Sequence, residues 1–72
     1  MSADESYQTA LEFVIAQCWA DGERHSEVLP DGIEVYAYAH PQGVAWGVND
    51  AARNFNVKRG IRKDDGTDVA VY

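Results

Sequence analysis

Several kinds of residue are scarce in this chain of 72 amino acids, and each scarcity excludes a class of protein. Cys18 is the one cysteine, so no disulfide can form within the chain. With two histidines, His25 and His40, the chain has too few Cys and His ligands for a zinc cage. No apolar run approaches the roughly 20 residues that a membrane-spanning helix needs. The length also excludes a two-domain dinucleotide-binding enzyme, a barrel enzyme and a P-loop NTPase.

Basic residues are half as frequent as acidic ones, and they are unevenly placed. Six Lys and Arg oppose twelve Asp and Glu, which gives a formal net charge of -6. Residues 1–34 hold eight of the acids and one base, whereas all five other bases lie within Arg53–Lys63. The acidic half is either a solvated face that keeps the protein dispersed or a surface for a basic partner.

The bulk properties predict one small domain in a reducing compartment. A core of this size alone rarely supplies more than about 3–5 kcal/mol, so we expect self-association or docking onto a larger partner. The segment Met1–Ser6 carries Asp4 and Glu5 and no base, unlike the start of a secretory signal. A single cysteine is typical of reduced interiors. We therefore predict a cytoplasmic protein.

Residues 4–20 have the apolar spacing of a helix, and Gly22 is placed to end it. Phe13 lies on the opposite side of this predicted helix, which makes a homodimer through that side an expectation. The main stripe, which we expect to pack on a sheet, consists of Tyr7, Leu11, Val14, Ile15 and Cys18.

Residues 33–48 alternate as a β-hairpin does, around a turn at His40-Pro41-Gln42-Gly43. If Ala39 faces Val44, the register places every apolar strand residue on one face. Tyr36 and Tyr38 then project from the other face. The predicted inward row is Ile33, Val35, Ala37, Ala39, Val44, Trp46 and Val48, and the small residues opposite the tyrosines are Ala45 and Gly47.

The remaining segments complete an α+β fold. Residues 21–32 indicate a loop, and residues 49–55 a short helical turn that Asn56 closes in the left-handed conformation. Residues 57–72 predict a second hairpin around Asp64-Asp65-Gly66, with a bulge at Gly60. We therefore predict one domain, 1–72, in which an N-terminal helix packs on a small antiparallel sheet of two hairpins.

Catalysis finds little support in the sequence. Cys18 lies on the core stripe and is interpreted as a buried structural thiol. His25 stands between Arg24 and Ser26-Glu27, but residues adjacent in sequence do not form a catalytic triad. His40 opens a proline-containing turn. Residues 64–68 lack the spacing and the terminal Glu of an EF-hand loop. We predict no enzyme activity, no cofactor and no metal.

The tyrosine pair favours a non-enzymatic binding protein. Tyr combines apolar area with a hydroxyl and few rotatable bonds, which suits an interface. Two alternatives are that the C-terminal segment with Tyr72 covers these rings and that the rings stack on bases of single-stranded nucleic acid. Carboxylates would steer the protein to a basic surface of a larger protein or nucleoprotein complex. We therefore predict an acidic adaptor or inhibitor, with a phage-type mimic of nucleic-acid charge that blocks a host enzyme as one version of it. The predicted contact residues are Tyr36, Tyr38, Glu12, Asp21, Glu23, Glu27 and Glu34.

The alternative is a small DNA- or RNA-binding regulator. The spacing of Ala52, Asn56, Val57 and Ile61 resembles that of helix-turn-helix regulators, but no room for a recognition helix remains before Asp64. The basic residues could contact phosphates, or they could offset the protein's own acidic half. The residues of this alternative site are Arg53, Lys58, Arg59, Arg62 and Lys63.

Overall fold

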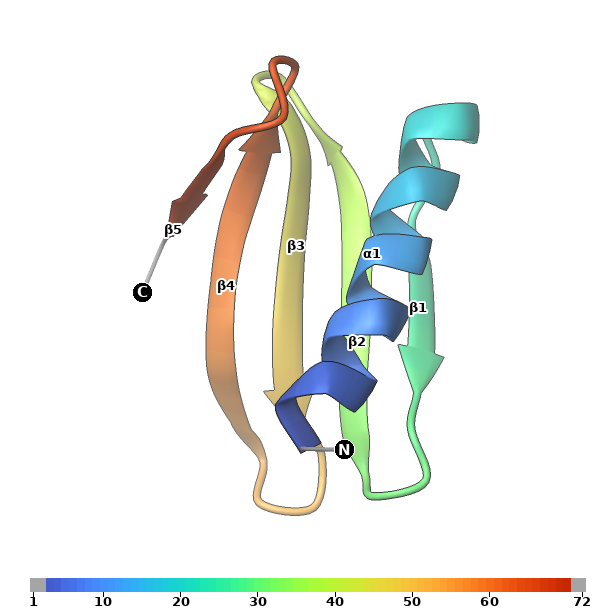
Figure 1. Cartoon of the computed structure of the whole chain (residues 1–72), viewed down its shortest axis with the longest axis vertical. Coiled ribbons are helices and arrows are strands. Elements are labelled where there is room, and N and C mark those ends of the chain that lie inside the picture. Colours follow the sequence, from blue (N-terminus) through green and yellow to red (C-terminus); the bar gives the residue numbers. More distant parts are fainter. Residues whose placement is uncertain (1–2, 71–72) are drawn as a thin grey trace.

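The computed structural model describes residues 3–70, without the side chains of residues 3–6, 55 and 70. Within this range a helix is followed by strands that form one antiparallel sheet in chain order (Figure 1). The predicted α+β class is confirmed. The elements are α1 (Ala3–Asp21), β1 (His25–Val28), β2 (Ile33–His40), β3 (Gly43–Asp50), β4 (Phe55–Lys63) and β5 (Asp68–Ala70).

Helix α1 packs its apolar stripe on one face of the sheet, over β1, β2 and β3. Leu11 and Val14 are each 1% exposed, and Cys18 is 2% exposed. The helix ends as predicted at Gly22, whose φ of 73° is left-handed and whose N–H donates to the Cys18 carbonyl at 2.7 Å. Glycine suits this position because the left-handed region carries no Cβ penalty for it.

The hairpin of β2 and β3 has the predicted register, with Ala39 opposite Val44. Val35, Ala37, Val44, Trp46 and Val48 form the sheet side of the core with α1. Two members of the predicted inward row depart from it, because Ile33 is only partly buried and Ala39 is exposed near the turn. The residues at the centre of this row are therefore buried, and those at its ends are partly buried or exposed.

Residues 21–32, expected to be a loop, contain the edge strand β1. His25 to Val28 pair with Ala37 to Glu34 of β2, with His25 opposite Ala37 and Val28 opposite Glu34. Sequence alternation could not show this strand, because three of its four residues are polar and most are exposed. Its pairing comes from backbone hydrogen bonds to β2 rather than from an apolar face of its own.

Residues 49–55 do not form the expected helical turn. Asn49 and Asp50 extend β3, residues 51–54 form a turn, and β4 begins at Phe55. An Asp that can cap a helix can equally close a turn, and here the Arg53 N–H donates to Asp50 Oδ1 at 3.2 Å. The left-handed residue is Asn54, with a φ of 56°, and not Asn56.

Pairing of β3 with β4 joins the two expected hairpins into one sheet. The register irregularity lies between Val48 and Asn49, whereas Gly60 pairs regularly with Trp46. Gly60 is required for a different reason: a Cβ there would lie 2.6 Å from the Trp46 ring and 2.8 Å from the Val69 carbonyl. The turn before β5 lies at the expected Asp64–Gly66, while Val71 and Tyr72 lie outside the described residues.

Candidate binding face of the sheet

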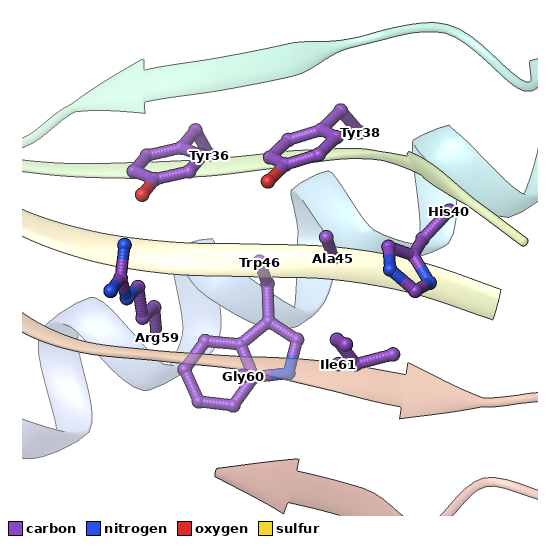
Figure 2. Close-up of a pocket in the computed structure, with 8 residues that line it drawn as sticks. All are labelled: Tyr36, Tyr38, His40, Ala45, Trp46, Arg59, Gly60 and Ile61. Atoms are coloured by element: carbon purple, nitrogen blue, oxygen red, sulfur yellow. The ribbon is translucent and has the colours of Figure 1, made fainter. Parts of the chain in front are cut away.

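The sheet has a helix face, which packs against α1, and an open face, which turns away from it. Side chains alternate between these faces along each strand. On the open face, pairing of β2, β3 and β4 sets three rows of residues side by side, which together form the tyrosine groove (Figure 2). The three rows are Tyr36–Gly47–Arg59, Tyr38–Ala45–Ile61 and His40–Gly43–Lys63.

One wall of the tyrosine groove is aromatic. The rings of Tyr36 and Tyr38 are nearly parallel, at 9°, with centroids 6.3 Å apart. This spacing follows from the two-residue repeat of a strand, which is about 6.6–6.8 Å. The Arg24 guanidinium lies 5.5 Å from the Tyr36 centroid, so that ring already has a cationic partner. Tyr38 remains 44% exposed and is the more available ring.

Small residues of β3 form the floor of the groove. A Cβ at Gly47 would lie 2.2 Å from Tyr36 Cζ, which shows that the Tyr36 ring lies across this glycine. At the next row Ala45 is 5% exposed and leaves space between Tyr38 and Ile61. The resulting hollow has a volume of about 300 Å³. Its size suits a planar ring or a single side chain.

The opposite wall carries Arg59, Ile61 and Lys63 from β4. Arg59 is exposed, and its side chain makes no hydrogen bond or ion pair with any residue that the structure describes. Ile61 is half-buried and faces Tyr38 across Ala45. Lys63 lies beside the β4–β5 turn, where hydrogen bonds from Thr67 and, to a smaller extent, the charge of Lys63 lower the pKa of Asp65. Arg59 is therefore the cation most available to a ligand.

His40 stands at the turn end of the aromatic wall. Its Nδ1 accepts a hydrogen bond of 3.1 Å from the Gln42 N–H, as the predicted turn role requires. The same side chain lines the hollow together with Tyr38. His40 thus has a structural role in the turn, and its ring is available at the end of the groove.

The predicted basic residues divide between the two faces. Lys58 and Arg62 point to the helix face, and Lys58 Nζ lies 5.2 Å from the Tyr7 ring centroid and 6.0 Å from that of Trp46. Arg53 lies in the turn after β3, with its Nε 3.7 Å from Asp50 Oδ2. The structure therefore does not gather the five bases of Arg53–Lys63 into one phosphate-binding surface.

Arg62 is held on the helix face by two carboxylates. Its Nη2 donates to Glu12 Oε1 at 2.8 Å and to Asp68 Oδ2 at 3.0 Å, and its Nη1 also donates to Glu12. Trp46 Nε1 donates to Asp68 Oδ1 at 3.3 Å. Hydrogen bonds from Arg62 lower the pKa of both Glu12 and Asp68. The network joins α1 to β4 and β5, which makes Arg62 structural.

The predicted acidic contact residues are also divided. Glu12 belongs to the Arg62 network, and Glu34 lies on the open face opposite Val28 and Asn49. Asp21, Glu23 and Glu27 lie at the end of α1 and along β1, which we call the acidic margin. Asp21 accepts hydrogen bonds from the Glu23 N–H at 2.9 Å and from His25 at 2.7 Å. Of the predicted carboxylates, only Glu34 shares the face of the tyrosines.

The groups that could carry chemistry are separated or enclosed. Cys18 is buried in the core, and burial raises the pKa of its thiol. His25 pairs with Asp21 on the helix side of β1, whereas His40 lies on the open face at the end of β2. Within residues 3–70 no group of three or more His, Cys, Asp or Glu residues could hold a metal ion. Over the same range no helix is long and apolar enough to span a membrane.

Comparisons with models of known protein families, with curated proteins and with solved structures find no match for this chain. Sequence reasoning identified both tyrosines and the small residues opposite them. It missed Ile61 and Arg24 as neighbours of the pair, because their positions depend on pairing beyond the β2–β3 hairpin.

Proposed function

We propose that this protein is a non-enzymatic binding protein, an adaptor or inhibitor that docks through its open face onto a larger protein or nucleoprotein complex. The observation that carries the proposal is the tyrosine groove. Within the described residues α1 packs on the helix face, and no other helix or strand layer packs on the open face. Two parallel phenol rings stand there beside an exposed arginine.

The composition of the open face supports docking. Tyr and Arg are the residue types most enriched among side chains that dominate binding energy. Both rings stand on a strand paired on its two sides, so little conformational entropy is lost on binding. Exposed apolar side chains extend the surface beyond the groove: Val69 lies opposite Ile61 and is 41% exposed. A contact centred on Tyr38 would bury aromatic and aliphatic area together.

The acidic margin gives the docking an orientation. Asp21, Glu23 and Glu27 lie along α1 and β1, apart from the row of Arg59 and Lys63 on β4. A partner would be steered into one pose if its negative groups met the open face near β4 and its positive groups met the acidic margin. Mimicry of nucleic-acid charge would have to use the acidic margin, because Glu12 is already paired with Arg62.

Partner capture tests this proposal. The tagged protein would be expressed in its source cells, cross-linked and recovered, in parallel with Tyr38→Ala and with Trp19→Ala. Trp19 is 46% exposed on α1, which packs on the helix face, and serves as the matched control. We expect Tyr38→Ala to lose a partner that Trp19→Ala retains. Equal recovery with Tyr38→Ala and the parent would contradict docking through the open face.

A further inference from the structure

The tyrosine groove combines two kinds of wall, and the combination specifies a ligand. β2 contributes parallel aromatic rings, and β4 contributes Arg59, which lies across β3 from Tyr36 (Figure 2). Lys63 of β4 lies across β3 from His40. Proteins that hold single strands pair a positively charged groove for the backbone with aromatic rings on which bases stack. We propose that the tyrosine groove binds single-stranded nucleic acid, such as an exposed strand of a nucleoprotein complex. This proposal rests on the proposed function of the open face.

Tyr38 is the stacking residue of this site. Tyr36 is engaged by Arg24 and lies across Gly47, whereas Tyr38 is 44% exposed beside the hollow over Ala45. The hollow of about 300 Å³ is lined by Tyr38, Ile61 and His40, so a base entering it meets a ring, an aliphatic group and an imidazole. Stacking of this kind requires no particular base, because every base has a π face.

Arg59 is the phosphate-binding residue. Its guanidinium has no partner among the described residues, in contrast to Arg62, which is engaged by Glu12 and Asp68. An unpaired guanidinium can donate a bidentate, charge-assisted pair of hydrogen bonds to a phosphate without first breaking an internal pair. Lys63 lies four residues further along β4 on the same wall and is positioned to approach a second phosphate.

The shape of the site favours a single strand over a duplex. A duplex is read by an element that protrudes into its groove, such as a helix or a two-stranded ribbon. The open face instead forms a recess between β2 and β4. These two strands lie about 9.5 Å apart, because β3 stands between them and two strand spacings separate them. A splayed base can enter such a recess, whereas paired and stacked bases cannot.

The charge balance predicts a weak dependence on salt. The net charge of -6 opposes long-range attraction, and the carboxylate of Glu34 lies on the same face as the cations of the groove. Two phosphate contacts would give a slope of log affinity against log salt of roughly -1.4, at about 0.7 per contact. Stacking on Tyr38 then supplies most of the affinity.

Fluorescence anisotropy of labelled oligonucleotides of about 10 nucleotides, with the full chain at low salt, tests the proposal. The strands would be homopolymeric DNA and RNA, compared with a duplex of the same length. We expect single strands to bind in preference to the duplex. Tyr38→Ala should weaken binding about 5- to 150-fold, the equivalent of the roughly 1–3 kcal/mol of one stacked base. Arg59→Gln should weaken binding and reduce the salt slope by about 0.7.

Arg53→Gln is the matched control, because Arg53 is an exposed arginine of the same segment outside the groove. Arg53→Gln should leave affinity within about twofold, since Arg53 lies in the turn after β3 and does not line the hollow. Thermal melting followed by circular dichroism would verify that each variant is folded. No binding of any single strand at low salt would overturn the proposal, as would a preference for duplex or an affinity that Tyr38→Ala leaves unchanged.

The result also separates this inference from the proposed function. If Tyr38→Ala loses a captured protein partner while the parent binds no oligonucleotide, the open face is functional but its occupant is a protein. If a captured partner is lost after nuclease treatment and the parent binds single strands, both proposals are supported. If Tyr38→Ala changes neither partner capture nor oligonucleotide binding, both fail.

Discussion

Arg59 and Arg62 lie three residues apart on β4, yet they belong to opposite faces of the sheet. Arg62 on the helix face is engaged by Glu12 of α1 and Asp68 of β5. Arg59 on the open face has no ion pair among the described residues and stands opposite Gly47 and Tyr36. The same residue type is part of the scaffold in one place and available to a ligand in the other.

This difference extends to the aromatic residues. On the helix face Trp46 is 7% exposed, covers Gly60 and donates a hydrogen bond to Asp68. On the open face Tyr38 is 44% exposed and contacts Tyr36. A single antiparallel sheet with a helix on one side packs one face against the core and leaves the other in contact with solvent. Stability and binding can therefore be altered separately, and the following variants test that separation.

The largest expected effect is on the helix face. Leu11→Ala removes a side chain that is 1% exposed and should lower the free energy of unfolding by about 2–5 kcal/mol. Tyr38→Ala should lower it by under about 1 kcal/mol, since an exposed cross-strand contact contributes little. Urea denaturation followed by circular dichroism measures both. Similar losses for the two variants would show that the open face is part of the core.

Two glycines offer the second comparison. Gly60→Ala places a Cβ against the buried Trp46 ring and the Val69 carbonyl, so we expect a loss of about 1–3 kcal/mol. Gly47→Ala meets only the Tyr36 ring tip, which can swing outward. It should therefore alter tyrosine fluorescence and ligand affinity more than stability. A larger loss of melting temperature for Gly47→Ala than for Gly60→Ala would contradict this assignment.

The two arginines differ in their effect on stability and on its pH dependence. Arg62→Gln should lower the free energy of unfolding by about 1–2 kcal/mol, a modest loss because the ion pairs of Arg62 are partly exposed. Arg59→Gln should change the free energy of unfolding by no more than about 0.5 kcal/mol. Arg62 lowers the pKa of Glu12 and Asp68 in the folded state. The stability they contribute is therefore fully present above their unfolded pKa values, about 4, and is lost as the pH falls through the lowered folded values.

Denaturation series at neutral and acid pH measure this dependence. The parent and Arg59→Gln should lose stability together as the pH falls below about 4, whereas Arg62→Gln should lose less over the same interval because its carboxylates are no longer paired. Parallel pH profiles for the parent and Arg62→Gln would contradict the role of this network.

The smallest expected change in stability is at Phe13, on the solvent side of α1. We expect the protein to form a homodimer through this residue, which is 56% exposed beside Leu29 and Glu27. Phe13→Glu should then sediment at the mass of a single chain, with stability measured at low concentration unchanged within about 0.5 kcal/mol. Equal sedimentation of the parent and Phe13→Glu would show that Phe13 mediates no self-association.

Features with a local physical cause were predictable from the sequence. The helix stripe and its stop at Gly22 follow from side-chain period and backbone freedom. The register of β2 with β3 follows from alternation, because a shift of one residue would turn every apolar side chain outward. That register alone placed Tyr36 and Tyr38 on the face away from the helix.

Features that depend on distant partners were not predictable in this way. β1 is polar and exposed, so its pairing with β2 leaves no periodic signal. Asn49-Asp50 is compatible with both a helix cap and a turn, so the sequence predicts a helix start where β3 ends. The sequence also presents the bases of Arg53–Lys63 as one run, although strand alternation sends Lys58 and Arg62 to one side and Arg59 to the other.

The sequence by itself determined the class of fold, the inward row of the central hairpin and the outward direction of the two tyrosines, because these follow from the 3.6- and 2-residue periods of the backbone. The tertiary structure decided which charges are satisfied within the protein and which face a ligand. Glu12 and Arg62 are 50 residues apart and meet only when α1 packs on the completed sheet. Local periodicity contains no information about such a contact, and it is this contact that distinguishes Arg62 from Arg59.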